Sequence, residues 1–365
     1  MEKLPLVFLT SFFVVLLANP ALIKVALLKR LFDEPGDERK IHTRRIPTIG
    51  GIMLFGGTIF TYALWYPIPT TTDFQVILEA FNNLKYLVAT TIILFFVGIK
   101  DDIIGTAPVK KLVAHIIVGM ILVLMADVRI TSMDGIFGVY TLPYWASIFL
   151  SMFTYIVVVN AFNLIDGVDG LAGGVGFIAS VLFGCWFIIV GDSELATLSF
   201  ALGGSLLAFL IFNFQPAKLF MGDSGSLTIG LILCVLAIRV IEYDPTVVEK
   251  TILRHVSQPV FAMAVLVYPL IDTLRIFIYR SLKGLSPFSA DKNHIHHKLI
   301  GLGLKHKGTV IIIYVFNIVV VGAAIVSGLL QPTFSFLLVF FVAAAATQIP
   351  FLIAQRKSIT KKADA

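Results

Sequence analysis

The sequence predicts an all-α polytopic membrane protein, and three observations support this fold class. Hydrophobic residues make up 58% of the 365 residues, charged residues make up only 14%, and the mean hydropathy is +0.94. A water-soluble domain carries about 25% charged residues. Apolar runs of about 18–23 residues recur along the chain, and each is long enough to cross the hydrocarbon core of a membrane as a helix. These runs lack the strict alternation of an outer-membrane barrel.

Eleven apolar segments are predicted to span the membrane, and residues 1–365 are expected to form a single integral membrane domain. The segments lie near 5–27, 49–66, 85–99, 111–128, 143–163, 170–191, 195–213, 224–241, 258–280, 309–330 and 333–355. The third is short, so we expect it to extend into its neighbours. Pro269 predicts a kink in the ninth segment, because proline removes a helical hydrogen bond. Alternating residues around Asp134-Gly135 predict a small outer β-hairpin.

The distribution of lysine and arginine predicts the orientation. Twenty of these residues fall in one set of loops and the C-terminal tail, whereas six fall in the opposite set. Positive residues mark the cytoplasmic side, so we expect the N-terminus outside and the C-terminus in the cytoplasm. The same asymmetry accounts for the net charge of +6 without nucleic-acid binding. Cys185 and Cys234 lie inside predicted spans and predict no disulfide and no cysteine-based zinc site.

Four polar clusters lie between the predicted spans, at residues 100–102, 163–170, 222–225 and 291–297. About two crossings separate each cluster from the next, so all four are predicted on the cytoplasmic face. Ionisable residues in a membrane protein are costly and mark functional sites. We therefore expect one site there that holds a metal ion and a charged substrate.

Acidic and amide side chains dominate the first two clusters. Asp101 and Asp102 end the third span and could bind a divalent cation, act as a general base, or form a solvated helix end. Asn163, Asp166 and Asp169 are spaced by three residues, which keeps them near one face of a helical turn. An Asp-Gly turn between two spans is the structural alternative for this second group.

The third and fourth clusters contain candidate phosphate-binding groups. Asp223 lies among glycines and serines whose backbone N–H groups begin the eighth span, which is a natural phosphate cradle and makes Asp223 a candidate metal ligand. The alternative is a helix N-cap. His294, His296 and His297 could contact phosphate oxygens, bind zinc with ligands from elsewhere, or contact anionic lipid headgroups.

Two further groups are open to more than one interpretation. Arg44 and Arg45 precede the second span, and the positive-inside rule alone accounts for their charge. Gly50 and Gly51 are expected to pack that span tightly. Near the inner end of the ninth span, Asp272 and Arg275 could form an internal salt bridge or belong to the site.

Together the four clusters resemble the motifs of the polyprenyl-phosphate N-acetylhexosamine-1-phosphate transferases, glycosyltransferase family 4. The motifs are Asp-Asp at 101–102, Asn-x-x-Asp-Gly-x-Asp-Gly-Leu at 163–171, Phe-Met-Gly-Asp-Ser-Gly-Ser at 220–226 and Asp-x-x-His-x-His-His at 291–297. They occur in the family's order over nearly the whole chain. The resemblance implies one transferase domain in the bacterial cytoplasmic membrane that moves N-acetylhexosamine 1-phosphate from a UDP-sugar to undecaprenyl phosphate. UMP is released, and Mg²⁺ is required, with Mn²⁺ as an alternative.

The resemblance also implies roles for individual residues. The metal ligands would be Asp223, Asn163 and Asp102. The catalytic set would be Asp101, Asp102, Asn163, Asp166, His294, His296 and His297. The donor nucleotide would be bound by Asp169, Asn213 and Phe220, to which we add Arg44 and Arg45.

The donor sugar and the rival classes are distinguished by details of the motifs. Ile295 interrupts the histidine run, which resembles the branch that uses UDP-N-acetylglucosamine for O-antigen, enterobacterial common antigen or teichoic acid. The peptidoglycan enzyme phospho-N-acetylmuramoyl-pentapeptide transferase is the alternative. A secondary transporter would place its carboxylates near the bilayer midplane, and a CDP-alcohol phosphotransferase would need further spaced aspartates. The exact sugar, the lipid chain length and a possible homodimer stay open.

Overall fold

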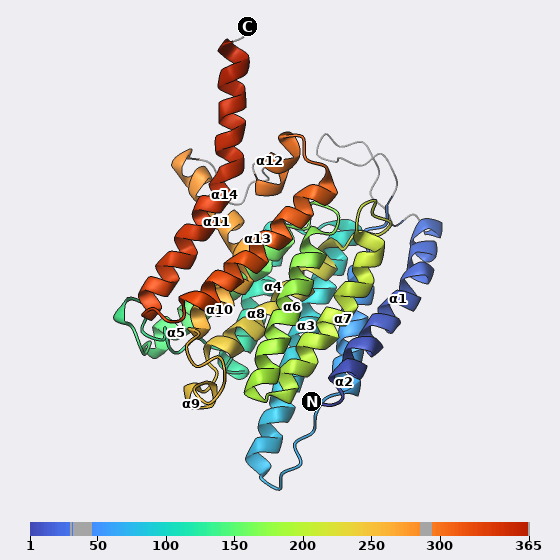
Figure 1. Ribbon diagram of the computed structural model, residues 1–365. Coiled ribbons are helices and arrows are strands. Elements are labelled where there is room, and N and C mark those ends of the chain that lie inside the picture. Colours follow the sequence, from blue (N-terminus) through green and yellow to red (C-terminus); the bar gives the residue numbers. More distant parts are fainter. Residues whose placement is uncertain (30, 32–45, 285–293, 364–365) are drawn as a thin grey trace. The chain divides into compact units, whose positions relative to one another are not determined.

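The computed structural model describes residues 1–29, 31, 46–284 and 294–363, with side chains described up to residue 355. No β-strand occurs among these residues, and every regular element is a helix. Contacts divide the chain into two compact units. Unit 1 comprises Met1–Ser132 and Thr141–Arg254, and unit 2 comprises Met133–Tyr140 and His255–Ala365 (Figure 1).

Within the described ranges, eight helices are long and apolar enough to cross a membrane. They are α1 (Leu4–Leu28), α4 with its continuation η1 (Pro108–Met120 and Ile121–Met125), α5 (Tyr144–Leu164), α6 (Leu171–Val190), α7 (Ser193–Asn213), α8 (Gly222–Ile241), α13 (His306–Ser327) and α14 (Pro332–Ala363). The bent pair α10 (Gln258–Val265) and α11 (Val267–Leu282) adds a ninth if it counts as one span. These helices confirm an all-α polytopic membrane protein.

The other two predicted spans fall on α2 (Gly51–Leu64) and α3 (Phe74–Ile104). α2 is a shorter apolar helix. α3 has 31 residues and extends beyond the predicted 85–99 at both ends, as expected for a span that appeared too short. The total of eleven spans, the orientation and the single-domain organisation stay predictions.

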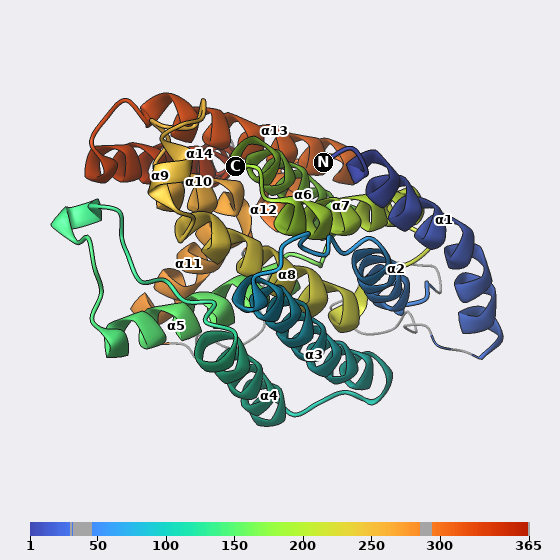
Figure 2. The ribbon, with the colours of Figure 1, turned by 90° about the horizontal axis from the view of Figure 1, so that it is seen from below.

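Helix α8 is the central helix of unit 1. The apolar stretch of α8 is 89% buried, compared with 22% for that of α1. α2, α3, α5 and α6 contact it from different sides, and Figure 2 shows it surrounded by them. Between Thr228 and Arg239, α8 is apolar on all faces, as expected for a fully enclosed helix. Its first turn is therefore held from several directions, which matters because it carries Asp223.

Glycines let two neighbouring backbones approach the first turn of α8. A Cβ at Gly51 of α2 would lie 2.1 Å from the backbone nitrogen of Gly225, and a Cβ at Gly98 of α3 would lie 2.4 Å from the Cα of Ser224. A Cβ at Gly50 would lie 2.6 Å from the carbonyl oxygen of Phe220. The predicted tight packing at Gly50 and Gly51 is confirmed.

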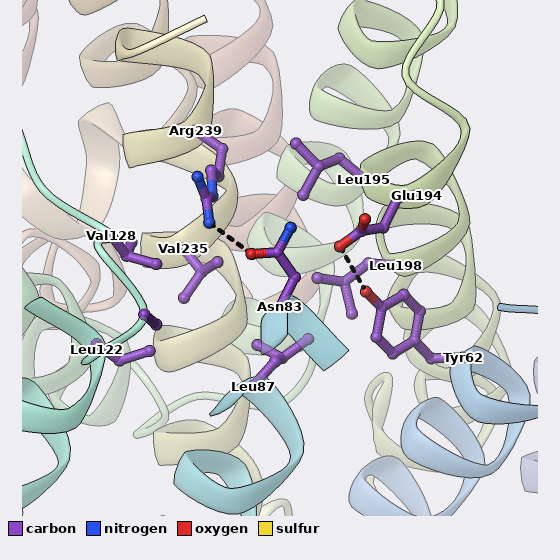
Figure 3. Close-up of a pocket in the computed structure, with 11 residues that line it drawn as sticks. Tyr62, Asn83, Leu87, Leu122, Val128, Glu194, Leu195, Leu198, Val235 and Arg239 are labelled. Atoms are coloured by element: carbon purple, nitrogen blue, oxygen red, sulfur yellow. Dashed lines mark hydrogen bonds between the residues drawn. The ribbon is translucent and has the colours of Figure 1, made fainter. Parts of the chain in front are cut away.

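A second polar cluster joins four helices at the end of α8 away from Asp223 (Figure 3). Arg239 in the last turn of α8 donates to Asn83 Oδ1 of α3 at 3.0 Å. Tyr62 of α2 donates to Glu194 Oε1 in the first turn of α7 at 3.4 Å. These side chains border a cavity of about 20 Å³, which has room for about one water molecule. We call them the Arg239 cluster.

In unit 2 the ninth predicted span is broken. α10 and α11 meet at an angle of 78°, and the break lies at Leu266, between the two helices. Pro269 explains this position, because its ring would clash with the carbonyl four residues earlier, that of Val265. Asn317 of α13 accepts a hydrogen bond from the backbone nitrogen of Tyr268 at 3.3 Å and so satisfies a donor that the break leaves free. The predicted kink is therefore present.

The loop after α4 contains the predicted tight turn. Asp134 and Gly135 have φ values of 50° and 80°, and the nitrogen of Ile136 donates to the carbonyl of Met133 at 3.0 Å. Two consecutive positive φ values are typical of a type I′ turn. A short 3-10 helix, η2 (Ile136–Gly138), follows in place of a strand. In unit 1, Ser132 and Thr141 form an isolated antiparallel bridge, so the loop is closed without the predicted hairpin strands.

Candidate active site

Asp102, in the last turn of α3, caps the N-terminus of α8. Its Oδ1 accepts a hydrogen bond from the backbone nitrogen of Asp223 at 2.6 Å. Its Oδ2 accepts from the backbone nitrogen and the hydroxyl of Ser224, at 3.1 and 2.7 Å. Gly222, the first residue of α8, has φ +70°, and a Cβ there would lie 2.7 Å from both Asp102 oxygens. The N–H groups that the sequence predicts as a phosphate cradle are thus bound to a carboxylate of the chain itself.

Asp223 lies between an amide and an ammonium group. Its Oδ1 accepts from Asn163 Nδ2 at 2.7 Å, and the same nitrogen lies 3.0 Å from Ser226 Oγ. Its Oδ2 pairs with the Lys111 ammonium of α4, and that ammonium lies 3.8 Å from Asp101 Oδ2. One cation therefore faces two carboxylates. We call Asp101, Asp102, Lys111, Asn163 and Asp223 the α8 cluster.

Asp166 joins this cluster from the loop after α5. Its carboxylate accepts a hydrogen bond from the backbone of Gly222. Burial, together with the negative charges of Asp223 and Asp102, raises the pKa of Asp166 well above its usual range. The second motif thus reaches the first turn of α8 through both Asn163 and Asp166.

Asn213 and Asp169 connect two loops and are themselves buried, with exposures of 3% and 6%. Asn213 Oδ1 accepts from the backbone nitrogen of Gly170 at 2.8 Å, and its Nδ2 donates to the carbonyl of Leu219 at 2.9 Å. Asp169 Oδ2 accepts from the backbone nitrogen of Ala217 at 3.2 Å. These bonds tie the loop before α6 to the loop before α8. Their role in binding the donor nucleotide stays a prediction, and the structure gives both residues a positioning role.

Phe220 joins the same loop to the segment before α2. Its nitrogen donates to the carbonyl of Pro47 at 2.8 Å, and its carbonyl accepts from Gly50 at 2.9 Å. The predicted site residues Arg44 and Arg45 directly precede this segment and lie outside the described residues. Asp291, which leads the fourth motif, also lies outside them.

In unit 2 the first histidine of the fourth motif is bound to a buried carboxylate. His294 Nδ1 donates to Asp272 Oδ2 at 2.7 Å, and Asp272 Oδ1 accepts from the backbone nitrogen of Ile295 at 3.0 Å. Asp272 lies on α11, and its side chain has no exposed surface. Because it accepts from the nitrogen of Ile295, it caps the start of α12 (Ile295–Gly301). Arg275 lies 3.4 Å from Asp272 Oδ1, so the predicted salt bridge is present.

The other two histidines have different surroundings. His296 is 1% exposed and its Nδ1 lies 3.1 Å from the hydroxyl of Tyr268. Burial lowers the pKa of His296 to about 3. His297 is half-buried, with its ring centroid 4.4 Å from that of His296. Within the described part of the chain, no three His, Cys, Asp or Glu side chains are arranged to hold a metal ion, so zinc finds no support there.

Lys111 is the site residue that sequence reasoning missed. In the sequence it is one of the twenty lysines and arginines that predict the orientation, and nothing in the four motifs includes it. Its position offered a signal, because a lysine in the first turn of a predicted span is costly unless it has a partner. The partners, Asp101 and Asp223, come from α3 and α8.

The α8 cluster has the donor chemistry of a magnesium site. Mg²⁺ prefers carboxylate oxygens and is usually held by one or two of them together with substrate phosphates and water. Asp101 and Asp223 supply two carboxylates around one cation, Lys111. The donor set therefore fits Mg²⁺ when a substrate supplies further oxygens.

Comparisons with known proteins identify the family of the chain. The profile of the family "Glycosyl transferase family 4" matches residues 84–241, which contain the whole α8 cluster. The chain is 32% identical over 302 residues to the decaprenyl-phosphate N-acetylglucosaminephosphotransferase of Mycobacterium tuberculosis, covering 79% of this chain and 74% of that protein. It is 29% identical over 335 residues to the undecaprenyl-phosphate alpha-N-acetylglucosaminyl 1-phosphate transferase of Salmonella typhi, covering 90% and 82%. The chain therefore belongs to glycosyl transferase family 4, on the branch that these two relatives represent.

Proposed function

We propose that this chain transfers N-acetylglucosamine 1-phosphate from UDP-N-acetylglucosamine to undecaprenyl phosphate and releases UMP. The observation that carries the proposal is the α8 cluster, in which Asp101 and Asp223 face one ammonium group at the end of a bundle of apolar helices. A site at the ends of membrane spans is accessible both to a soluble anionic donor and to an acceptor held in the bilayer. The names of the relatives support the sugar and the lipid class.

The reaction joins two anions. An oxygen of the lipid phosphate attacks the β-phosphorus of the donor, the bond from that phosphorus to the bridging oxygen breaks, and UMP leaves with the electron pair. A phosphate monoester has a second pKa near 6, so about nine-tenths of the acceptor is dianionic at neutral pH and needs no strong base. The protein's task is then to position the two phosphates and offset their charge.

The residues of the α8 cluster divide this task. Lys111 supplies a positive charge beside Asp101 and Asp223. Asn163 orients the Asp223 carboxylate through a 2.7 Å hydrogen bond. Mg²⁺, or Mn²⁺ in its place, would be held by Asp223 and Asp101 and would neutralise charge on the diphosphate oxygens. Asp102 is better assigned to capping α8 than to metal ligation, because both of its oxygens already accept hydrogen bonds.

The histidines and the membrane orientation complete the proposal. The resemblance of the fourth motif assigns His294, His296 and His297 to the catalytic residues, and His294 is held by its Nδ1 contact with Asp272. We place the site on the cytoplasmic face of the bacterial inner membrane, with the N-terminus outside, on the lysine and arginine asymmetry. A protease-sensitive tag after Ala365 should then be protected in intact spheroplasts, and cleavage by external protease would reverse the orientation.

Transfer of radiolabel from UDP-N-acetylglucosamine into butanol-extractable lipid by the purified protein tests the function. The wild type should form labelled lipid and UMP in equal amounts. Asp223→Ala should lower the rate at least about a hundredfold, whereas Asp244→Asn, at an exposed loop position, should keep the wild-type rate. No labelled lipid from the folded wild type would refute the function, and a preference for UDP-muramoyl-pentapeptide would move the chain to the peptidoglycan branch.

A further inference from the structure

His115 on α4 carries a buried nitrogen without a partner. The residue is 2% exposed, and its Nδ1 lies 3.3 Å from the hydroxyl of Tyr155 on α5. Among the residues that the structure describes, none forms a hydrogen bond with its Nε2. Buried polar atoms almost always have partners in native proteins, so an exception needs an explanation.

The partner at Nδ1 determines which nitrogen carries the proton. A phenol is a strong donor and neutral imidazole is a good acceptor, so the favoured arrangement is a Tyr155 hydroxyl that donates to Nδ1. The proton of the neutral ring then lies on Nε2. Gly119 keeps this geometry tight, because a Cβ there would lie 3.1 Å from Tyr155 Cδ1. His115 thus presents a fixed N–H donor that lacks an acceptor.

The location of this donor connects it to the α8 cluster. Lys111 and His115 are four residues apart, which places them on one face of α4. His115 interacts electrostatically with both Lys111 and Asp223. Four residues of helix rise about 6 Å, so His115 lies that much further along the α4 span, away from its Pro108 end, than Lys111 does. A group bound there would lie beside the cluster and within the span.

We propose that His115 Nε2–H binds a phosphate oxygen of the membrane-held acceptor, the polyprenyl phosphate, next to Lys111. An anionic oxygen is the acceptor that a buried N–H donor beside an ammonium group favours. The depth of His115 in the span assigns it to the lipid phosphate in preference to the soluble nucleotide donor. Tyr155 acts on the substrate only through His115 and is a positioning residue. This inference rests on the proposed function.

Initial rates test the inference, with each substrate varied in turn while the other is saturating. His115→Phe should raise the KM for undecaprenyl phosphate about 10- to 100-fold, the effect of losing one hydrogen bond to a charged group, and should leave the KM for UDP-N-acetylglucosamine within about twofold. His115→Gln places an amide N–H at similar reach and should restore the KM to within about threefold of wild type. Val113→Phe, on the same helix and 50% exposed, is the matched control.

Two additions keep the outcome decisive. His115→Phe leaves the Tyr155 hydroxyl without its partner, so the double variant His115→Phe/Tyr155→Phe, in which both polar groups are gone, is the version that should fold normally. Equilibrium binding of undecaprenyl phosphate to protein in nanodiscs, without donor, should weaken by the same factor as the KM rises. Unchanged lipid affinity in the folded double variant would overturn the inference, and so would an effect confined to the donor. A wild type that binds the lipid but transfers nothing would instead refute the proposed function.

Discussion

The carboxylate of Asp102 binds Ser224 twice, through the backbone nitrogen at 3.1 Å and the hydroxyl at 2.7 Å. The two residues belong to different helices, so this contact joins the end of α3 to the start of α8. Asp102 also accepts a hydrogen bond from the backbone nitrogen of Asp223, the residue before Ser224. The two contacts together therefore set the direction in which the Asp223 side chain points away from α8. The Asp-Asp motif therefore works partly as a structural device.

Asp102→Ala should lower both stability and activity. Loss of an N-cap costs about 1–2 kcal/mol, and here it leaves the backbone nitrogens of Asp223 and Ser224 without their acceptor. Thermal denaturation in detergent and the transfer rate measure the two effects. Asp73→Ala is the matched control, because Asp73 caps the exposed start of α3 by accepting from Gln75 at 2.9 Å. Asp73→Ala should destabilise the protein, and its transfer rate should fall only in proportion to the loss of folded protein. An inactive Asp102→Asn variant of unchanged stability would argue for a metal or base role.

Lys111→Gln should make the protein more responsive to Mg²⁺. Lys111 offsets the charges of Asp101 and Asp223, so the variant without divalent cation should melt at a lower temperature than the wild type. Added Mg²⁺ should then raise the melting temperature more in the variant, because no ammonium competes for the two carboxylates. Transfer should still fall at least about tenfold at saturating Mg²⁺, since the fixed charge is lost. Equal Mg²⁺ responses in the two proteins would contradict a shared cation position.

Acidification should destabilise unit 2 through His296. Burial lowers the pKa of His296 to about 3 in the folded protein, whereas an unfolded histidine has a pKa near 6.5. Between these values the unfolded state binds the extra proton, so stability is lost as the pH falls below about 6.5. Between pH 7 and 5 the loss should be about 2 kcal/mol. The drop in melting temperature over that range should be smaller in His296→Gln, and an identical drop would refute the assignment.

The Arg239 cluster should matter for stability without affecting chemistry. Arg239 and Asp223 lie 16 residues apart on α8, which is about 24 Å along the helix. A double-mutant cycle of Arg239→Met and Asn83→Ala should give a coupling energy of about 1 kcal/mol for their 3.0 Å hydrogen bond. Unfolding in SDS gives the energies, and the kcat of each folded variant should equal that of the wild type. A lower kcat would show that the two ends of α8 are coupled.

The helices were largely predictable, because long apolar runs are constrained by bilayer thickness alone. Even the break at Leu266 followed from Pro269. The roles of Asp102, Asn213 and Lys111 were harder to predict, because their partners lie on other helices and single-sequence spacing carries no information about such contacts. Asp102 matched a cation-binding pattern but bonds to backbone donors of α8.

The outer turn shows the reverse situation. The predicted turn at Asp134-Gly135 is present, with positive φ at both residues, because a turn conformation is a local property of the residues that form it. The predicted hairpin strands on either side of this turn do not form, and Ser132 and Thr141 make an isolated bridge in their place. Strand formation depends on pairing over several residues, which the turn residues alone do not determine.

The contacts at Gly51 and Gly98 restrict how this enzyme could be redesigned. A methyl group at either position would have to displace the backbone of α8 itself, so even alanine is excluded there without moving Asp223. Libraries that seek a new donor sugar should therefore leave these two glycines and residues 222–226 unchanged. Diversity belongs at positions whose side chains make no contact with this rigid junction, where a change of shape leaves the reacting groups in place.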